Sequence, residues 1–117
     1  MALARGDIVL VPFPFTDLTA RKVRPAVVVS PDPKHGDVVV AFISSVVTPA
    51  SNPRDWVLHD SHSDFGATGL KTTSAFRMGK LLTLHRALIF RRLGRVSPAI
   101  QRELDDKLRH AVGLAAP

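Results

Sequence analysis

The chain has no cysteine and no long apolar run, and these two absences exclude several kinds of protein. Without cysteine, its 117 residues can form neither a disulfide framework nor a thiolate metal site, which fits a reducing compartment. No stretch reaches the roughly 18 consecutive apolar residues that a membrane span needs, and the start MALARGDIVL lacks a signal-like apolar segment. We therefore expect a cytoplasmic protein without a membrane anchor.

Acidic residues are scarce relative to basic ones. Sixteen Lys and Arg against ten Asp and Glu give a net charge of +6. Such a surface attracts polyanions, either nucleic acid or an acidic protein segment. At 45% apolar and 22% charged residues the composition is that of a folded chain, and the length predicts one domain over residues 1–117.

The common catalytic and nucleotide-binding motifs are also missing. There is no G-x-S-x-G elbow, no Walker loop and no G-x-G-x-x-G. His59 and His62 form the one close histidine pair, and they lie at a strand end before two glycines. A solvated loop is the favoured interpretation of this pair, ahead of a metal site or a general acid and base.

What the sequence does contain is a series of short β-branched runs, which predict a mainly β fold. The segment between the first two runs, residues 12–24, holds Pro12 and Pro14, so it is predicted to be a surface loop or an irregular hairpin arm. It is long for a hairpin, and loops of this length are often functional. The predicted strands are 8–11, 26–29, 37–43, 56–59, 74–78, 81–84 and 87–90. The run 37–43 is apolar nearly throughout, which predicts a strand covered on both faces.

The end of the chain has a helical pattern instead. Ser97 is a good N-cap, Pro98 suits the first helical position, and Gly113 suits a C-terminal cap. Apolar residues recur three or four positions apart between them, which predicts an amphipathic helix over residues 97–112. Several strands followed by one helix favour an α+β arrangement, a small curled sheet or barrel with the helix packed against it.

Arg24 stands immediately before Pro25, at the mouth of a predicted strand. Proline disfavours the helical region for the preceding residue, so the Arg24 backbone is expected to be extended and its side chain to project from a fixed point. A planar guanidinium held in this way suits a phosphate, which it can bind through two hydrogen bonds. On pattern alone, a solvated strand end is the favoured interpretation of Arg24.

Four segments of the chain resemble the PemK/MazF family of toxins from type II toxin-antitoxin systems. They are GDIVLVPFPFTD at 6–17, KVRPAVVVS at 22–30, DVVVAFIS at 37–44 and RMGKLLTLHRALIFRRLGRVS at 77–97. The resemblance implies a homodimeric SH3-like barrel that cleaves single-stranded RNA, including mRNA, at short sequences without a metal or other cofactor. It also implies an antitoxin whose acidic tail occupies the same groove as the RNA.

The resemblance further implies catalytic roles for Arg24 and Ser44. The family's catalytic arginine precedes the proline of the second strand, and its partner is usually a threonine just after the third strand. Here that position holds Ser44, which keeps the hydroxyl but lacks the methyl that restricts the threonine rotamer. Ser45 and Thr48 lie close enough in sequence to be the partner instead.

Other residues are predicted to contact RNA. Arg21 and Lys22 are candidate phosphate contacts, with a solvated loop as the alternative. For Phe13 and Trp56, core or interface packing is favoured over stacking on bases, and the cluster of Arg91, Arg92 and Arg95 is interpreted as a solvated face. The remaining candidates for the RNA groove are Phe15, Thr16, Ser45, Thr73 and Ser74.

A second function from another class stays open at this point. A toxin that poisons a protein target such as a topoisomerase, or a member of the family that only binds RNA or its antitoxin, would have the same fold. The replacement of the usual threonine by Ser44 is compatible with a protein that does not cleave RNA, whereas Arg24 with a neighbouring hydroxyl favours the enzyme.

Overall fold

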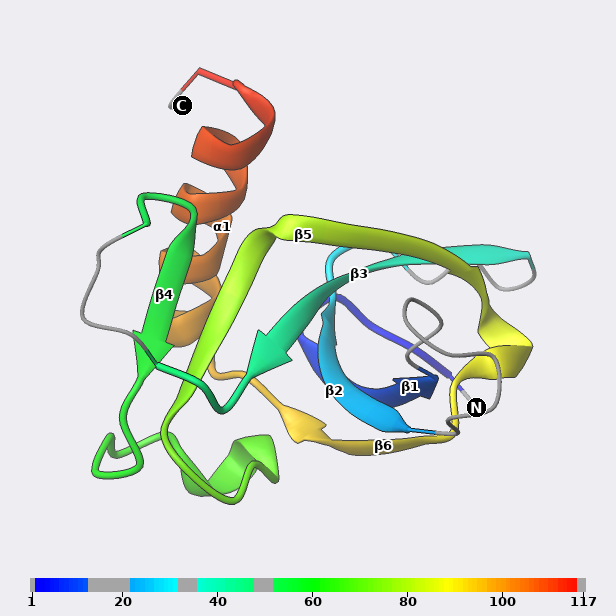
Figure 1. Ribbon diagram of the computed structural model, residues 1–117, viewed down its shortest axis with the longest axis horizontal. Coiled ribbons are helices and arrows are strands. Elements are labelled where there is room, and N and C mark those ends of the chain that lie inside the picture. The colour runs from blue at the N-terminus through cyan, green and yellow to red at the C-terminus, as the bar shows by residue number, and fades with distance from the viewer. Residues whose placement is uncertain (1, 13–21, 32–35, 48–51, 116–117) are drawn as a thin grey trace.

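Six antiparallel strands form one strongly curved sheet, and a single long helix follows them at the C-terminus (Figure 1). The computed structural model describes residues 2–12, 22–31, 36–47 and 52–115. The strand order across the sheet is β4-β5-β3-β2-β1-β6. The strands are β1 (Asp7–Pro12), β2 (Val23–Val28), β3 (Asp37–Ser44), β4 (Asp55–Leu58), β5 (Ser74–His85) and β6 (Arg91–Arg95). The prediction of a mainly β half-barrel with a C-terminal helix is confirmed.

The centre of the sheet is buried on both faces. On β3, Val38, Val40 and Phe42 belong to one apolar cluster, whereas Ala41 and Ile43 belong to another. The first cluster lies inside the curl of the sheet. The second includes Ile100 and Leu104 of the helix α1 (Pro98–Val112). The continuous apolar run of β3 therefore reflects two covered faces, as the sequence predicted.

The helix is bounded as the sequence predicted. The Ser97 hydroxyl accepts a hydrogen bond from the Ile100 N–H, Pro98 occupies the first turn, and Gly113 adopts the left-handed conformation at φ 76°. The two predicted strands at 74–78 and 81–84 are a single strand, β5, which bends sharply (Figure 1). Residues 78–80 have no partner on β3, because the pairing moves directly from Phe42↔Arg77 to Ala41↔Leu81. This irregular bulge of three residues explains why the sequence pattern predicted two separate strands there.

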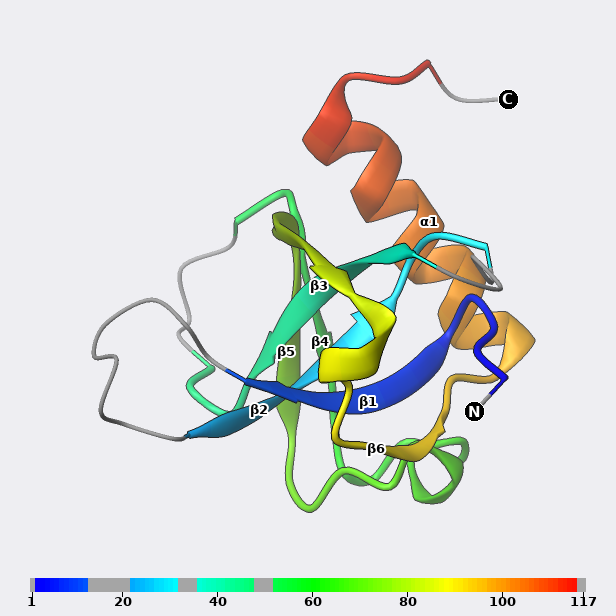
Figure 2. The same ribbon diagram turned by 90° about the vertical axis from the view of Figure 1, so that its right-hand side faces the viewer.

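The strand predicted over residues 87–90 is wrong. A 3-10 helix η2 (Arg86–Leu88) occupies this segment, and the strand follows it as β6. The His85 ring nitrogen Nδ1 accepts a hydrogen bond from the Ala87 N–H at 3.1 Å, which fixes a turn at the end of β5. The predicted loop after β4 is also partly ordered as a second 3-10 helix, η1 (Gly66–Thr68), which lies beside β6 (Figure 2).

Candidate functional site

An open groove of about 1180 Å³ crosses the end of the sheet where β2 begins and β3 ends. Its walls come from the bulged part of β5, the segment after η1, and β6. Arg24, Ser44, Ser45 and Ser74, four of the residues predicted to act on RNA, all line it. The fold therefore brings together residues that lie 50 positions apart in the sequence.

Arg24 and Ser44 lie on the same face of neighbouring strands. The ladder between β2 and β3 pairs Ala26 with Phe42, and Arg24 and Ser44 each lie two residues beyond that pair in the direction of the groove. Because alternate residues of a strand share a face, both side chains fall on the face that carries Phe42. The ladder itself ends at Ala26↔Phe42, so Arg24 and Ser44 lie just beyond its paired part, and both line the groove.

Pro25 is tolerated in β2 because of where the strand ladders stop. Arg24 is part of β2, where it pairs with Val11 of β1, so its backbone is extended as predicted. The ladder to β3 begins only at Ala26, and Pro25 therefore lies where a missing N–H costs no bond to β3. The Arg24 side chain is exposed at the groove, while Ala26, Val27 and Val28 are fully buried.

The Ser44 hydroxyl is already oriented by its own backbone. Its oxygen accepts a hydrogen bond from the Val46 N–H at 3.0 Å, which is a local turn typical of serine. The oxygen is thereby held in place while the hydroxyl proton remains to donate. Ser45, the other candidate partner, is exposed and follows the end of β3. Of the two serines, Ser44 has the better defined geometry next to Arg24.

The groove is also lined by four cations that the sequence analysis did not predict to contact RNA. They are Lys71, Arg77, Lys80 and Arg91. No Asp or Glu is among the described residues that line the groove with them. In the sequence these four residues share nothing but their positive charge. The bulge of β5 and the turn after η1 bring them together in the groove. The result is a strongly cationic groove suited to a polyanion.

One wall of the groove is fixed by two glycines that let backbones touch. A Cβ on Gly94 of β6 would lie 2.3 Å from the carbonyl oxygen of Ala67, and a Cβ on Gly69 would lie 2.2 Å from that of Leu93. Gly69 also adopts φ +74°, which other residues rarely do. These contacts hold η1 against β6 and so position the groove-lining segment from Gly69 to Thr72.

The remaining residues predicted to contact RNA differ in where they lie. Lys22 is exposed next to β2 but is not among the groove-lining residues. The Thr73 hydroxyl accepts a hydrogen bond from the Asp60 N–H at 3.0 Å, and the Ser74 hydroxyl donates to the Thr72 carbonyl at 2.8 Å. Both hydroxyls therefore stabilise the turn that enters β5. Phe13, Phe15, Thr16, Arg21 and Thr48 lie outside the described residues.

The arginine cluster of β6 is divided between two surroundings. Arg91 lines the groove, whereas Arg95 and Arg92 reach the buried carboxylate of Asp7 at 2.9 and 3.7 Å. The Asp7 carboxylate also accepts a hydrogen bond from the Ala4 N–H at 2.9 Å. All three arginines are exposed, as the predicted solvated face requires, and Arg92 and Arg95 in addition anchor β6 to β1.

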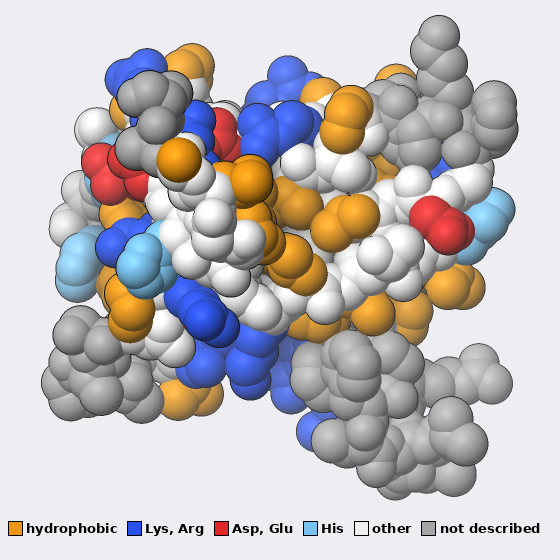
Figure 3. Space-filling model, turned by 90° about the horizontal axis from the view of Figure 1, so that it is seen from above, with side chains coloured by type: hydrophobic (Ala, Val, Ile, Leu, Met, Phe, Trp, Pro, Cys, Tyr) orange, Lys and Arg blue, Asp and Glu red, His pale blue; other side chains and the backbone are white. Residues whose placement is uncertain are grey.

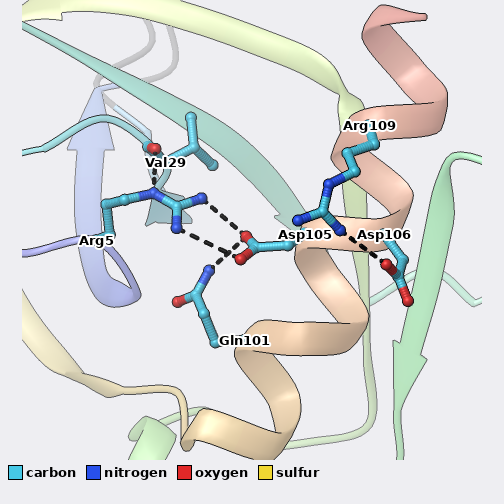
Figure 4. A network of polar contacts seen from close by, with 6 residues as sticks. All are labelled: Arg5, Val29, Gln101, Asp105, Asp106 and Arg109. Carbon is cyan, nitrogen blue, oxygen red and sulfur yellow. Dashed lines mark hydrogen bonds and ion pairs between the residues drawn. The ribbon is translucent and has the colours of Figure 1, made fainter. Parts of the chain in front are cut away.

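A second carboxylate joins the N-terminal segment to the helix (Figure 4). The Arg5 guanidinium lies 2.8 Å from the Asp105 carboxylate and donates from Nε to the Val29 carbonyl, also at 2.8 Å. Gln101 donates to the same carboxylate at 2.9 Å. Burial raises the pKa of Asp105, but hydrogen bonds from Arg5 and Gln101 and the charges of Arg5 and Arg109 outweigh it, so the pKa is lowered.

The histidine pair and Trp56 belong to the structural part of the molecule. Trp56 packs against the cluster beneath α1, with its ring 6.1 Å from Phe76 and 6.4 Å from the ring of His62. The packing role favoured for Trp56 is confirmed. In residues 2–12, 22–31, 36–47 and 52–115, no three His, Cys, Asp or Glu side chains lie close enough together to hold a metal ion. The helices of these ranges include none long and apolar enough to cross a bilayer.

Comparison with known families agrees with the resemblance seen in the sequence. The model of the PemK-like, MazF-like toxins of type II toxin-antitoxin systems matches residues 4–112. The chain belongs to this family. No curated protein matches the chain.

Solved structures of PemK/MazF proteins share the fold. An endoribonuclease from a mycobacterial species, solved in complex with its cognate antitoxin, is 23% identical, with a TM-score of 0.71 over 99% of this chain and 100% of the other. The Mycobacterium tuberculosis toxin MazF-mt6 is 18% identical, with a TM-score of 0.73 over 94% and 99% of the two chains. A MazE-MazF complex from Deinococcus radiodurans gives 19% identity and a TM-score of 0.73 over 98% and 100%.

Proposed function

We propose that this member of the PemK/MazF family is a sequence-specific endoribonuclease, an mRNA interferase that cleaves single-stranded RNA without a metal. One observation carries the proposal: Arg24 of β2 and Ser44 of β3 line one groove that has five cations and no carboxylate among its described lining residues. Membership of the toxin family and the endoribonuclease names of structural relatives support it.

In the proposed reaction the RNA supplies its own nucleophile. The ribose 2′-oxygen attacks the adjacent phosphorus, and the bond from phosphorus to the 5′-oxygen of the next nucleotide breaks. The proton lost from the 2′-hydroxyl passes to a base, and the departing 5′-oxygen gains a proton. The products are a 2′,3′-cyclic phosphate and a 5′-hydroxyl end, which explains why no triad of protein groups is required.

Arg24 is assigned the electrostatic part of this reaction. An arginine stays protonated in proteins, so it stabilises the charge that develops on the phosphorane oxygens rather than moving a proton. Ser44 then donates from its hydroxyl to one of those oxygens, because its own oxygen is engaged by the Val46 N–H. The two side chains together hold the reacting phosphate between β2 and β3.

The family also supports proposals about partners. We expect a homodimer, and an antitoxin with an acidic segment that competes with RNA for the cationic groove. Two of the structural relatives named above were solved together with an antitoxin or MazE. Charge complementarity between an acidic segment and the groove's cations supports the same arrangement here.

The test is cleavage of a pool of single-stranded RNA by the purified protein in EDTA. We expect defined cuts with 5′-hydroxyl and 2′,3′-cyclic phosphate ends, and no cutting of the same sequences made with 2′-deoxyribose. Cuts that leave 5′-phosphate ends would contradict the proposed chemistry. Absence of cleavage of any RNA would favour the alternative in which the protein only binds RNA, an antitoxin or a protein target such as a topoisomerase.

A further inference from the structure

The strongest candidate beyond Arg24 and Ser44 is Arg77, which lies in β5 at the last position before its bulge. In the register of β3 and β5, Arg77 pairs with Phe42 and Ala75 pairs with Ser44. Paired residues of an antiparallel ladder share a face, so Arg77 projects on the face that carries Phe42, Ser44 and Arg24. Its half-buried side chain lines the same groove.

The position of Arg77 relative to Arg24 follows from the sheet geometry. The two residues lie on strands separated by β3, and both line the groove. With neighbouring strands about 4.8 Å apart, two strand spacings separate their backbones by roughly 10 Å or more. Two guanidinium groups on one face at this spacing can hold two anionic groups of a single extended ligand.

Arg77 is not used to stabilise the fold through a described carboxylate. Asp55 is its cross-strand neighbour on β4, yet no ion pair between the two is present in the described part of the chain. Elsewhere in that part, Arg5, Arg95 and Arg109 each contact a carboxylate at 3.0 Å or less. A half-buried arginine beside Lys80 in a groove whose described lining has no acid is available for an external anion.

The lining of the groove around Arg77 is consistent with a nucleic-acid ligand. On the face of the molecule seen from above, Lys and Arg side chains gather in separate groups with hydrophobic side chains between them (Figure 3). The groove itself mixes cations with apolar walls that include Leu70, Leu81 and Leu93. Phosphates on cations and bases on apolar surface are what a single strand offers.

We propose that Arg77 is a substrate-binding residue that holds a phosphate adjacent to the one held by Arg24 and Ser44. The proposal rests on the proposed function and deepens it by assigning the second phosphate of a single-stranded nucleic acid to β5. The guanidinium forms two hydrogen bonds with that phosphate, and Lys80 adds charge to the same site.

The test measures binding separately from cleavage. A single-stranded 2′-deoxy oligonucleotide lacks the attacking hydroxyl, so its Kd can be measured over a range of salt concentrations without being cut. We expect Arg77→Ala to raise Kd about tenfold and to reduce the slope of log Kd against log salt by about 0.7, the value for one phosphate contact on a single strand.

Three further variants control for position, charge and folding. Arg102→Ala removes one exposed cation from α1, outside the groove, and is expected to leave both Kd and the salt slope nearly unchanged. Arg77→Lys keeps the charge, so it is expected to restore the salt slope but only part of the affinity, because lysine cannot form the paired hydrogen bonds. If Arg77→Ala fails to fold, Arg77→Gln, which keeps most of the side-chain length, replaces it in the same measurement.

The outcomes separate this proposal from the proposed function. An unchanged Kd and salt slope for folded Arg77→Ala would overturn the role of Arg77, even if the wild-type protein cleaves RNA as expected. The same result together with weakened binding of an acidic peptide would assign Arg77 to a protein partner instead. Conversely, a wild-type protein that binds the deoxy oligonucleotide through Arg77 but cuts no RNA would overturn the proposed cleavage and support the phosphate site.

Discussion

The cations of this molecule fall into two regions that differ in what lies beside them. In the groove, the described lining residues include five cations and no carboxylate. On the side formed by the N-terminal segment, β6 and α1, the carboxylates of Asp7 and Asp105 each contact at least one arginine. Basic residues thus pair with buried or half-buried carboxylates in one region, whereas in the other they line a groove without a carboxylate among its described lining residues. Net charge alone does not distinguish these two uses.

The largest effect is expected at Arg24, in the groove. Arg24→Ala removes a preorganised cation from the developing phosphorane charge, so RNA cleavage is expected to fall by a factor of about 10² to 10³. Because the Arg24 side chain is exposed, the Tm is expected to change little. Cleavage rates and thermal unfolding of Arg24→Ala are measured beside Arg102→Ala, and cleavage at the wild-type rate by Arg24→Ala would remove the proposed mechanism.

Gly94 connects the two regions, because β6 carries Arg91 in the groove and Arg95 at Asp7. Gly94→Ala would bring a Cβ against the backbone of Ala67 and Thr68, and we expect a loss of about 2 to 3 kcal/mol of unfolding free energy. Gly66→Ala is the matched control, since no atom lies within 4 Å of its added Cβ. Equal denaturant midpoints for the two variants would show that the junction of η1 and β6 is not tight.

Asp7 tests the region in which carboxylates pair with arginines, formed by the N-terminal segment, β6 and α1. Asp7→Ala removes a fully buried carboxylate that accepts from the Ala4 N–H and from Arg95, so we expect a loss of about 2 kcal/mol of unfolding free energy. Denaturant unfolding measures this loss. Binding of a single-stranded oligonucleotide by the folded variant is expected to stay at the wild-type level, and a clear fall in affinity would mean that the two regions are coupled.

Ser44 tests how completely the serine replaces the family's usual threonine. Ser44→Ala removes the hydroxyl that donates to the phosphate, and we expect about a tenfold fall in cleavage rate. Ser44→Thr keeps the hydroxyl and restricts its rotamer, so its rate is expected to equal or exceed that of the wild type. Single-turnover rates compare the variants, and a wild-type rate for Ser44→Ala would transfer the role to Ser45.

The smallest effect is expected at Asp105, whose side chain is 25% exposed. The pKa of Asp105 is lowered in the folded state. Its contribution to the free energy of unfolding is therefore present above the unfolded-state pKa of 3.8 and is lost as the pH falls through the folded-state pKa. Asp105→Asn is expected to lose less than about 1 kcal/mol at pH 7. Unfolding measured from pH 7 to pH 3 is expected to show this difference shrink, and a difference that grows toward acid would contradict the assignment.

Local patterns predicted the elements well where apolar runs or helix-capping residues set the pattern. Ser97, Pro98 and Gly113 bound the helix as expected, and the valine runs of β2 and β3 are strands. The predictions failed at the end of β5 and at β6, where the decisive contacts are distant in sequence. The strand β6 consists of RRLGR, which has little β-branched character, and its pairing with β1 is stabilised by the Asp7 carboxylate.

The sequence by itself determined a basic, cysteine-free, mainly β chain of the PemK/MazF family, and its resemblance to that family pointed to Arg24 and Ser44. Only the tertiary structure decided that these two residues line one groove, that Arg77 lines the same groove, and that Arg91 and Arg95 have different surroundings. The physical reason is that composition and local sterics act within a few residues. Strand register and the bulge of β5 instead determine which distant side chains share a face.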